Sequence, residues 1–254
     1  MKKLLSKEVP VPEALIRVKE TEMSIIAEAA AILTKGRIVD LSKKVVPGGA
    51  PGAVGAPARW YQIGQFTYPP GELMHYIAME SHISTHVEAP SHFLPALHHR
   101  PGDDVSEVPV ERFFGMAVLV NCKDMAVNTQ IGPEILKALP IEVGDIVVVG
   151  NSPWQATQRP WLTIEGIDYL VDDRKIKMIG LDDTVYVERP EVRGKNLAGY
   201  YLHDKTLSNG IPVIEQMAHL SDLSKARFFF MGIPAAMGGL DSFPIRAVAI
   251  EPGD

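Results

Sequence analysis

The chain has 254 residues, of which 46% are hydrophobic and 22% charged, a balance typical of a globular protein with a sizeable core and no dominant disordered tail. Its 31 acidic and 25 basic residues give a net charge of −6 and no basic stripe, which argues against nucleic acid as a partner. Cys122 is the only cysteine, so an internal disulfide and cysteine-rich metal sites are excluded, and any metal must use nitrogen and oxygen ligands.

The N-terminal segment is predicted to be a helical extension. Apolar residues between positions 12 and 33 recur at steps of three and four, as on one face of an amphipathic helix, and Gly36 fits a helix stop. We therefore assign residues 1–36 to this extension and residues 37–254 to the main domain. The segment lacks the apolar core of a secretory signal, and no apolar run approaches the roughly 20 residues that span a bilayer. A soluble, cytoplasmic protein that does not bind membranes is expected.

The main domain is predicted to contain many strands and few helices. Residues 37–41 are typical of an opening strand, and the Gly- and Pro-rich stretch 47–57 is expected to form a surface loop near a pocket. Helices are predicted at 133–139 and at 163–171, the second with Thr163 as its N-cap. Further β-rich runs lie at 73–79, 116–120, 145–149, 176–181, 227–231 and 245–250. This pattern indicates an α/β or α+β domain with a large sheet.

A dense group of histidines and a carboxylate is the main functional signal. His82, His86, Glu88 and His92 follow one another within a short run. A divalent ion such as zinc or manganese takes imidazole nitrogens and carboxylate oxygens at about 2.0 to 2.2 Å, and a catalytic ion keeps one position open. A polar surface loop would explain a lone H-x-x-x-H, but it is a poor explanation of a run that also contains Glu88, Pro90 and His92.

Regular secondary structure cannot bring these side chains together. On a helix His82 and His86 share a face, but Glu88 points away. On a straight strand the two histidines would be about 13 Å apart, at roughly 3.3 Å per residue. We therefore predict a strand that ends near His82, a tight turn at Ser84-Thr85 and an extended stretch through Glu88, since Pro90 disfavours helix before it.

The run from His82 to His92 resembles the signature H-x-G-T-H-x-D-x-P-x-H of the cyclase-like metal hydrolases, the family of bacterial kynurenine formamidase and isatin hydrolase. Asp40-Leu41-Ser42 is similar to the family's opening strand, Gly180-Leu181-Asp182 to its central G-[IL]-D, and residues 243–250 to its closing strand. The resemblance covers the chain from about residue 37 to 251. It implies an α/β fold with a swivelling β/β/α domain and a large mixed sheet.

The resemblance also implies the site residues. The implied metal ligands are His82, His86, Glu88, His203 and Glu215. His203 and Glu215 are chosen because residues 209–215 are similar to the family's G-I-P-[IV]-I-E phrase and His203 precedes them at the appropriate distance. Glu88 would be shared by two ions, and His92 would be the general acid/base. One or two zinc or manganese ions per subunit are expected.

Two residues inside the signature differ from the family pattern. Ser84 replaces the usual glycine, and because serine tolerates a positive φ poorly, we expect a different backbone form at the turn. Glu88 replaces the usual aspartate. Its extra methylene lengthens the reach by about one carbon–carbon bond, enough to move an ion or to change one-metal into two-metal occupancy.

Together these observations predict a metal-dependent amidohydrolase. A metal-activated water would attack, and His92 would take up a proton and return it to the leaving group. The resemblance implies a small amide, formamide or cyclic amide as substrate, cleaved at its C–N bond. Two alternatives stay open: a lactone or ester hydrolase using the same site, and a catalytically silent metal-binding member, against which the presence of His92 argues. A homodimer or homotetramer is the expected assembly.

Overall fold

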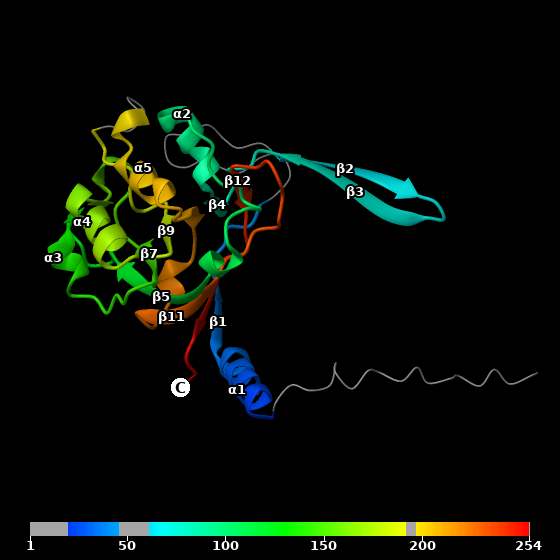
Figure 1. The fold of residues 1–254 in the computed structure, drawn as a ribbon, viewed down its shortest axis with the longest axis horizontal. Coiled ribbons are helices and arrows are strands. Elements are labelled where there is room, and N and C mark those ends of the chain that lie inside the picture. Colours follow the sequence, from blue (N-terminus) through cyan, green and yellow to red (C-terminus); the bar gives the residue numbers. More distant parts are fainter. Residues whose placement is uncertain (1–19, 46–60, 192–196, 254) are drawn as a thin grey trace, which may run out of the picture. The chain divides into compact units, whose positions relative to one another are not determined.

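The computed structural model describes residues 20–45, 61–191 and 197–253 (Figure 1). Contacts divide the chain into two units, one that contains helix α1 (Glu20–Lys35) and one formed by Ile38–Glu251. The helix predicted from the N-terminal periodicity is thus helical from residue 20 onward. Residues 12–19 of that prediction and the predicted loop at 47–57 lie outside the described residues. Within the described part of the chain, no helix is both long and apolar enough to cross a membrane.

Among the described residues, nine strands form one mixed sheet at the centre of the second unit (Figure 1). Its order is β1 (Arg37–Asp40), β13 (Val248–Glu251), β11 (Arg227–Met231), β5 (Phe114–Asn121), β7 (Ile146–Gly150), β9 (Met178–Asp182), β10 (Val213–Met217), β4 (His86–Glu88) and β12 (Ser242–Pro244). Strands β5, β7, β9 and β10 run parallel, whereas β4, β11, β12 and β13 pair antiparallel with their neighbours. The predicted fold class, an α/β protein with a large mixed sheet, is confirmed.

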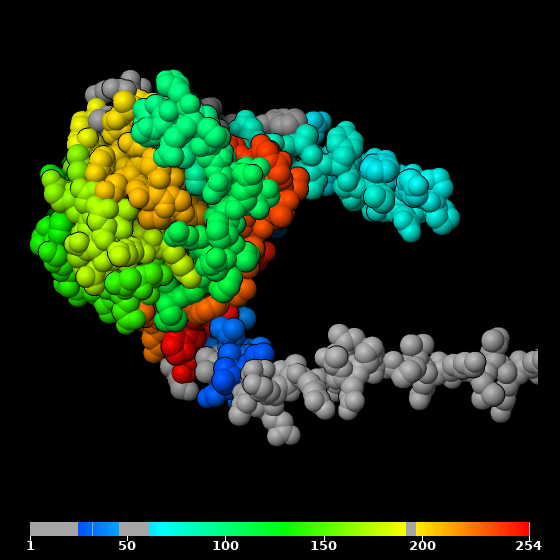
Figure 2. All heavy atoms as spheres, in the orientation of Figure 1, coloured from blue at the N-terminus to red at the C-terminus, as the bar shows by residue number. Residues whose placement is uncertain are grey.

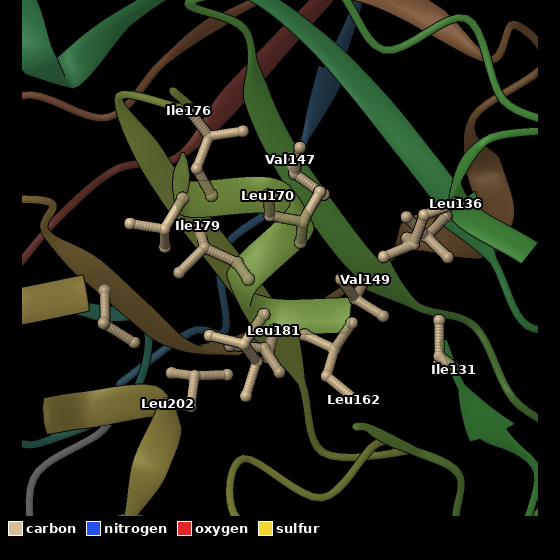
Figure 3. Packing of buried hydrophobic residues seen from close by; sticks show 14 of the residues in the cluster. Ile131, Leu136, Val147, Val149, Leu162, Leu170, Ile176, Ile179, Leu181 and Leu202 are labelled. Carbon is tan, nitrogen blue, oxygen red and sulfur yellow. The ribbon is translucent and has the colours of Figure 1, made fainter. Parts of the chain in front are cut away.

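Central strands β7 and β9 are buried along their whole length. Their near-continuous apolar sequence suits parallel strands that are covered on both faces. Because side chains alternate along a strand, Val147 and Val149 join one hydrophobic cluster, while Ile146 and Val148 join a second cluster on the opposite face. Figure 3 shows part of the first cluster. The core therefore lies on both faces of the sheet and holds its strands in a fixed register.

Helices α3 (Pro133–Leu136), α4 (Ile164–Asp168) and α5 (Tyr201–Ser208) contribute apolar side chains to the first cluster. The Thr163 hydroxyl accepts the backbone N–H of Gly166, so the predicted N-cap is confirmed. The other described helical segments are α2 (Leu94–His98), a π-helical segment at Tyr169–Asp173, and 3₁₀ turns at Pro90–His92, Val110–Phe113, Ala156–Gln158, Leu197–Gly199 and Leu220–Asp222.

Two smaller sheets accompany the large one. Strands β6 (Gln130–Ile131) and β8 (Trp161–Leu162) form a short parallel pair. Strands β2 (Tyr61–Tyr68) and β3 (Glu72–Met79) form an antiparallel hairpin. The sequence predicts β3 but not β2, because Gly64 and two glutamines interrupt the apolar pattern of β2. This hairpin leads directly into the histidine-rich run.

Candidate metal centre

The register at one edge of the large sheet brings distant parts of the chain together. On β4, His86 lies opposite Glu215 of β10 and, on the other side, opposite Pro244 of β12. Residues directly opposite each other in an antiparallel pair share a face, and so do residues two apart in one strand. The backbone alone therefore places His86, Glu88 and Glu215 on the same face of the sheet.

The predicted turn before β4 is confirmed. Strand β3 ends at Met79, the chain turns, and β4 is extended from His86 to Glu88. Ser84 nevertheless retains the left-handed backbone that a glycine would adopt, with a φ of 59°, which corrects our expectation of a different form. Its buried hydroxyl donates to the backbone carbonyl of Lys43 at 3.0 Å, a contact that holds the residue in this conformation.

A first set of donor atoms comprises His82 Nδ1, His86 Nε2 and Glu88 Oε1. The three distances between these atoms are 3.3 Å, 3.0 Å and 3.5 Å. Ligands that share an ion at about 2.1 Å lie roughly 3.0 to 3.5 Å from one another. The nitrogen and oxygen donors are thus spaced as a divalent ion would require, and their chemistry suits zinc or manganese.

A second set faces the other oxygen of Glu88. The Oε2 atom lies 3.1 Å from His203 Nε2, which in turn lies 3.5 Å from Glu215 Oε1. Glu88 Oε2 is buried and makes no hydrogen bond of acceptable geometry with any described residue. An unsatisfied buried carboxylate oxygen is costly, and coordination to an ion would satisfy it. All six residues named from the sequence, His92 included, therefore converge around Glu88.

Each histidine in the two sets has its remaining nitrogen fixed by an acceptor. His86 Nδ1 contacts the carbonyl of Ser84 at 2.7 Å, and His203 Nδ1 contacts Glu188 at 2.8 Å. His82 Nε2 contacts Asp241 Oδ2 at 2.9 Å. A ring N–H donated to such an acceptor fixes the tautomer and turns the other nitrogen toward the metal position, as in many metalloproteins.

Glu188 was not identified from the sequence. Its buried carboxylate contacts the His203 ring and also accepts the backbone N–H groups of Leu202 and His203, at 3.3 Å and 2.9 Å. These groups belong to the first turn of α5, where a negative charge is favourable. The same side chain therefore anchors the helix and orients the imidazole. The only local signal was an acidic residue following the apolar pair Tyr186-Val187.

Asp241 was also missed, and it joins the metal centre to His92. Its Oδ2 atom contacts His92 Nδ1 at 2.8 Å as well as His82 Nε2, and its Oδ1 accepts the Ser81 hydroxyl at 3.2 Å. His92 Nε2 is left facing Glu88 Oε1, at 3.7 Å. One carboxylate thus sets the orientation of a candidate ligand and of the candidate acid/base.

These contacts shift the pKa values of the ionisable groups at the site. Hydrogen bonds from His82 and His92 hold the pKa of Asp241 far below its usual range. Burial opposes a charged His82, but the carboxylates of Asp241 and Glu88 outweigh it and raise the pKa of His82 to about 9. Burial likewise opposes ionisation of Glu88, yet the surrounding histidines, His92 first among them, keep its pKa well below the ordinary value.

The metal-free protein is expected to lose stability as the pH rises toward 9. The pKa of His82 is raised by folding from 6.5 to about 9, so its stabilising contribution is fully present below pH 6.5 and is lost as the pH rises through about 9. Thermal unfolding in the presence of a chelator, measured between pH 6 and pH 10, checks this. Asp241→Asn should flatten the dependence, and an unchanged profile in that variant would contradict the assignment.

Comparisons with known proteins agree with this architecture. The family model Cyclase matches residues 39–188. Cyclase-like protein 1 of Oryza sativa subsp. japonica is 25% identical over 232 residues, 85% of this chain and 79% of that protein. Isatin hydrolase A from Labrenzia aggregata has a similar structure, with a TM-score of 0.71 and 20% identity over 92% of this chain and all of that one. A potential metal-dependent hydrolase with cyclase activity gives a TM-score of 0.65 at 22% identity, covering 86% and 99% of the two chains.

Proposed function

Because the chain belongs to the Cyclase family, we propose that it is a metal-dependent hydrolase that cleaves the C–N bond of a small amide, formamide or cyclic amide. The observation that carries this proposal is the convergence of two donor sets on Glu88 with His92 beside them. A structural metal site is closed and needs no acid/base next to it. Similar folds include proteins named isatin hydrolase, and their name supports the choice of a hydrolytic reaction.

Different side chains would have different roles in the proposed hydrolysis. A divalent ion, when bound, polarises a carbonyl and makes water nucleophilic near neutral pH. His82, His86 and Glu88 would hold it. His92 Nδ1 donates to Asp241, so its Nε2 carries the lone pair and faces the site. We assign to Nε2 the proton released by the attacking water, which then passes to the leaving nitrogen as the C–N bond breaks.

Two ions per subunit are proposed, one in each donor set. Glu88 directs its two oxygens at different partners, Oε1 toward His82 and Oε2 toward His203. A carboxylate with this orientation can bridge two cations, and Glu215 completes the second set. Titration with zinc and with manganese, followed by elemental analysis after gel filtration, gives the stoichiometry. A limit of one ion would exclude the second position.

The reaction is tested with a panel of substrates. Protein stripped with a chelator and reloaded with zinc or manganese would be incubated with aryl formamides, isatin, small lactones and aryl esters. Hydrolysis of an amide that disappears on chelation and returns on reloading supports the proposal. Turnover of lactones or esters alone would identify the same site as an esterase. Stoichiometric metal with no turnover of any compound would identify a silent binding protein.

Replacing Asp241 with asparagine is expected to weaken metal binding by about 10- to 100-fold, the usual effect of removing a carboxylate that orients a ligating histidine. The amide keeps the shape but cannot serve as the anionic acceptor for both imidazoles. Competition with a chromogenic chelator measures the affinity, and ¹⁵N shifts of the metal-free imidazoles report the tautomers. Asp124→Asn makes the same substitution at an exposed aspartate and should change neither the metal affinity nor the tautomers. If the two variants behaved alike, Asp241 would not orient the histidines.

A further inference from the structure

Asp241 and His92 lie on two segments that are distant in sequence. His92 ends the 3₁₀ turn that follows β4, whereas Asp241 ends the loop that leads from β11 to β12. Their side chains meet at 2.8 Å between Oδ2 and Nδ1, and this distance depends on what holds the two backbone segments in place. Residues 102–105 contact both segments, and we refer to them as the connecting segment.

On the side of His92, the connecting segment packs directly against backbone. The carbonyl of Asp103 accepts the N–H of Ser91, the residue before His92, at 3.0 Å. Gly102 approaches the same stretch so closely that an added Cβ would lie 2.6 Å from the Pro90 carbonyl carbon and 2.7 Å from the Ser91 nitrogen. Because Cβ atoms do not come this close to backbone, only glycine fits at this position.

On the side of Asp241, the connecting segment makes two further hydrogen bonds. The N–H of Val105 donates to the carbonyl of Leu240, the residue before Asp241, at 2.9 Å. The carboxylate of Asp104 accepts the backbone N–H of Gly239 at 2.5 Å through Oδ2. Figure 2 shows the green connecting segment beside the orange-red loop that precedes β12. Both neighbours of the candidate acid/base pair are thus attached to one short segment.

Of these contacts, only that of Asp104 is made by a side chain. Its other oxygen, Oδ1, accepts the backbone N–H and the hydroxyl of Ser106 at 2.7 Å and 2.6 Å, and the N–H of Glu107 at 3.2 Å. These hydrogen bonds, that of the Ser106 hydroxyl first and that of Gly239 next, lower the pKa of Asp104 from its usual value. The ionised carboxylate can therefore accept on both oxygens at once, whereas an amide cannot.

We propose that Asp104 is a positioning residue for the candidate metal centre. Through Gly239 it fixes the end of the loop that carries Asp241. Asp241 in turn holds His82 and His92 in the orientation that their proposed roles require, and the inference rests on those roles. Support of this kind matters for catalysis, because a displacement of about 1 Å in a distant residue can lower turnover by about 100-fold.

Asp104→Asn separates the two tasks of this side chain. The amide oxygen can keep the three donors of the turn, but the amide NH₂ then faces the N–H of Gly239, and two donors cannot bond. In the metal-free protein, the imidazole ¹⁵N shifts of His82 and His92 should move toward those of Asp241→Asn. In the metal-loaded protein, kcat should fall by about 10- to 100-fold while KM stays within about twofold.

Ser106→Ala is the matched control, because it removes one hydrogen bond from the same carboxylate and leaves the contact with Gly239. It should keep the wild-type imidazole shifts and kcat. If Asp104 only stabilised the turn, Asp104→Asn would lower the melting temperature and leave the shifts and kcat unchanged, and that result would overturn the proposal. The shifts are measured without metal or substrate, so they test the positioning role even if no substrate is turned over.

A double variant tests the route of the effect. If Asp104 acts through Asp241, adding Asp104→Asn to Asp241→Asn should change the imidazole shifts and the metal affinity no further than Asp241→Asn does alone. Effects that add up in the double variant would mean that the two residues act independently. The assignment of Asp104 as a support for Asp241 would then be wrong.

Discussion

Glu88→Gln is expected to lower hydrolysis by about 10³-fold or more, because a bound ion contributes several kcal/mol to the transition state and each 1.36 kcal/mol is a factor of ten. The substitution changes both donor sets at once, since Oε1 faces His82 and Oε2 faces His203. The amide keeps one acceptor oxygen but loses the negative charge. Elemental analysis should accordingly find the variant depleted of metal.

The same change should also reduce stability. Glu88 is buried against histidines, and removal of one partner from a buried charge pair costs about 3 to 5 kcal/mol. Glu251→Gln provides a matched control, because Glu251 is equally buried but accepts the N–H groups of Ser224 and Lys225 away from the site. It should lose stability while keeping metal and turnover. A Glu88→Gln protein with full metal content would contradict the bridging role.

His92→Ala is expected to reduce turnover by about 10²- to 10⁴-fold, the usual range for removal of a general acid/base, without loss of metal. Turnover and metal content are expected to respond differently because of where His92 lies. His92 Nε2 lies 3.7 Å from Glu88 Oε1, whereas the ligand atoms of the first set lie no more than 3.5 Å from one another. His82, Glu88 and His92 also lie close enough together to hold an ion, so the metal content of the variant decides between a ligand and an acid/base.

The measurement pairs kcat with metal content in each preparation. His98→Ala is the control, because His98 lies a few residues further on, is exposed and pairs with Asp204. It should behave as wild type in both assays. If His92→Ala lost metal in proportion to activity, His92 would be a ligand rather than the proton carrier. If it retained full turnover, the assignment of the proton to Nε2 would be wrong.

The local part of the candidate site could be predicted from the sequence, and the distant part could not. The candidate ligands from His82 to His92 are close in sequence, and neither a helix nor a straight strand can bring their side chains together. This alone predicts the turn at Ser84-Thr85. Asp241 contributes only because β12 pairs with β4, and no periodicity in the sequence encodes that pairing. Glu188 depends in the same way on where α5 begins.

The fold shows a similar division. Buried strands such as β7 and β9 have long apolar runs and were located to within two residues. Strand β2 was missed because it is exposed on both faces, and Gly64 and two glutamines interrupt the alternation of apolar and polar positions that marks a half-buried strand. Helix α5 was missed because charged residues break the apolar stripe on its short length. Strand β2 and helix α5 therefore form because of tertiary contacts rather than because of local sequence preference.

The register that joins β4 to β10 and β12 also governs when in folding an ion can be captured. His86 meets Glu215 and Pro244 only after long stretches of chain have closed, so conformations with separate strands offer at most part of a donor set. An ion bound at this centre would therefore stabilise the completed fold rather than start its formation. Its main expected effect would be a slower rate of unfolding in the metal-loaded protein.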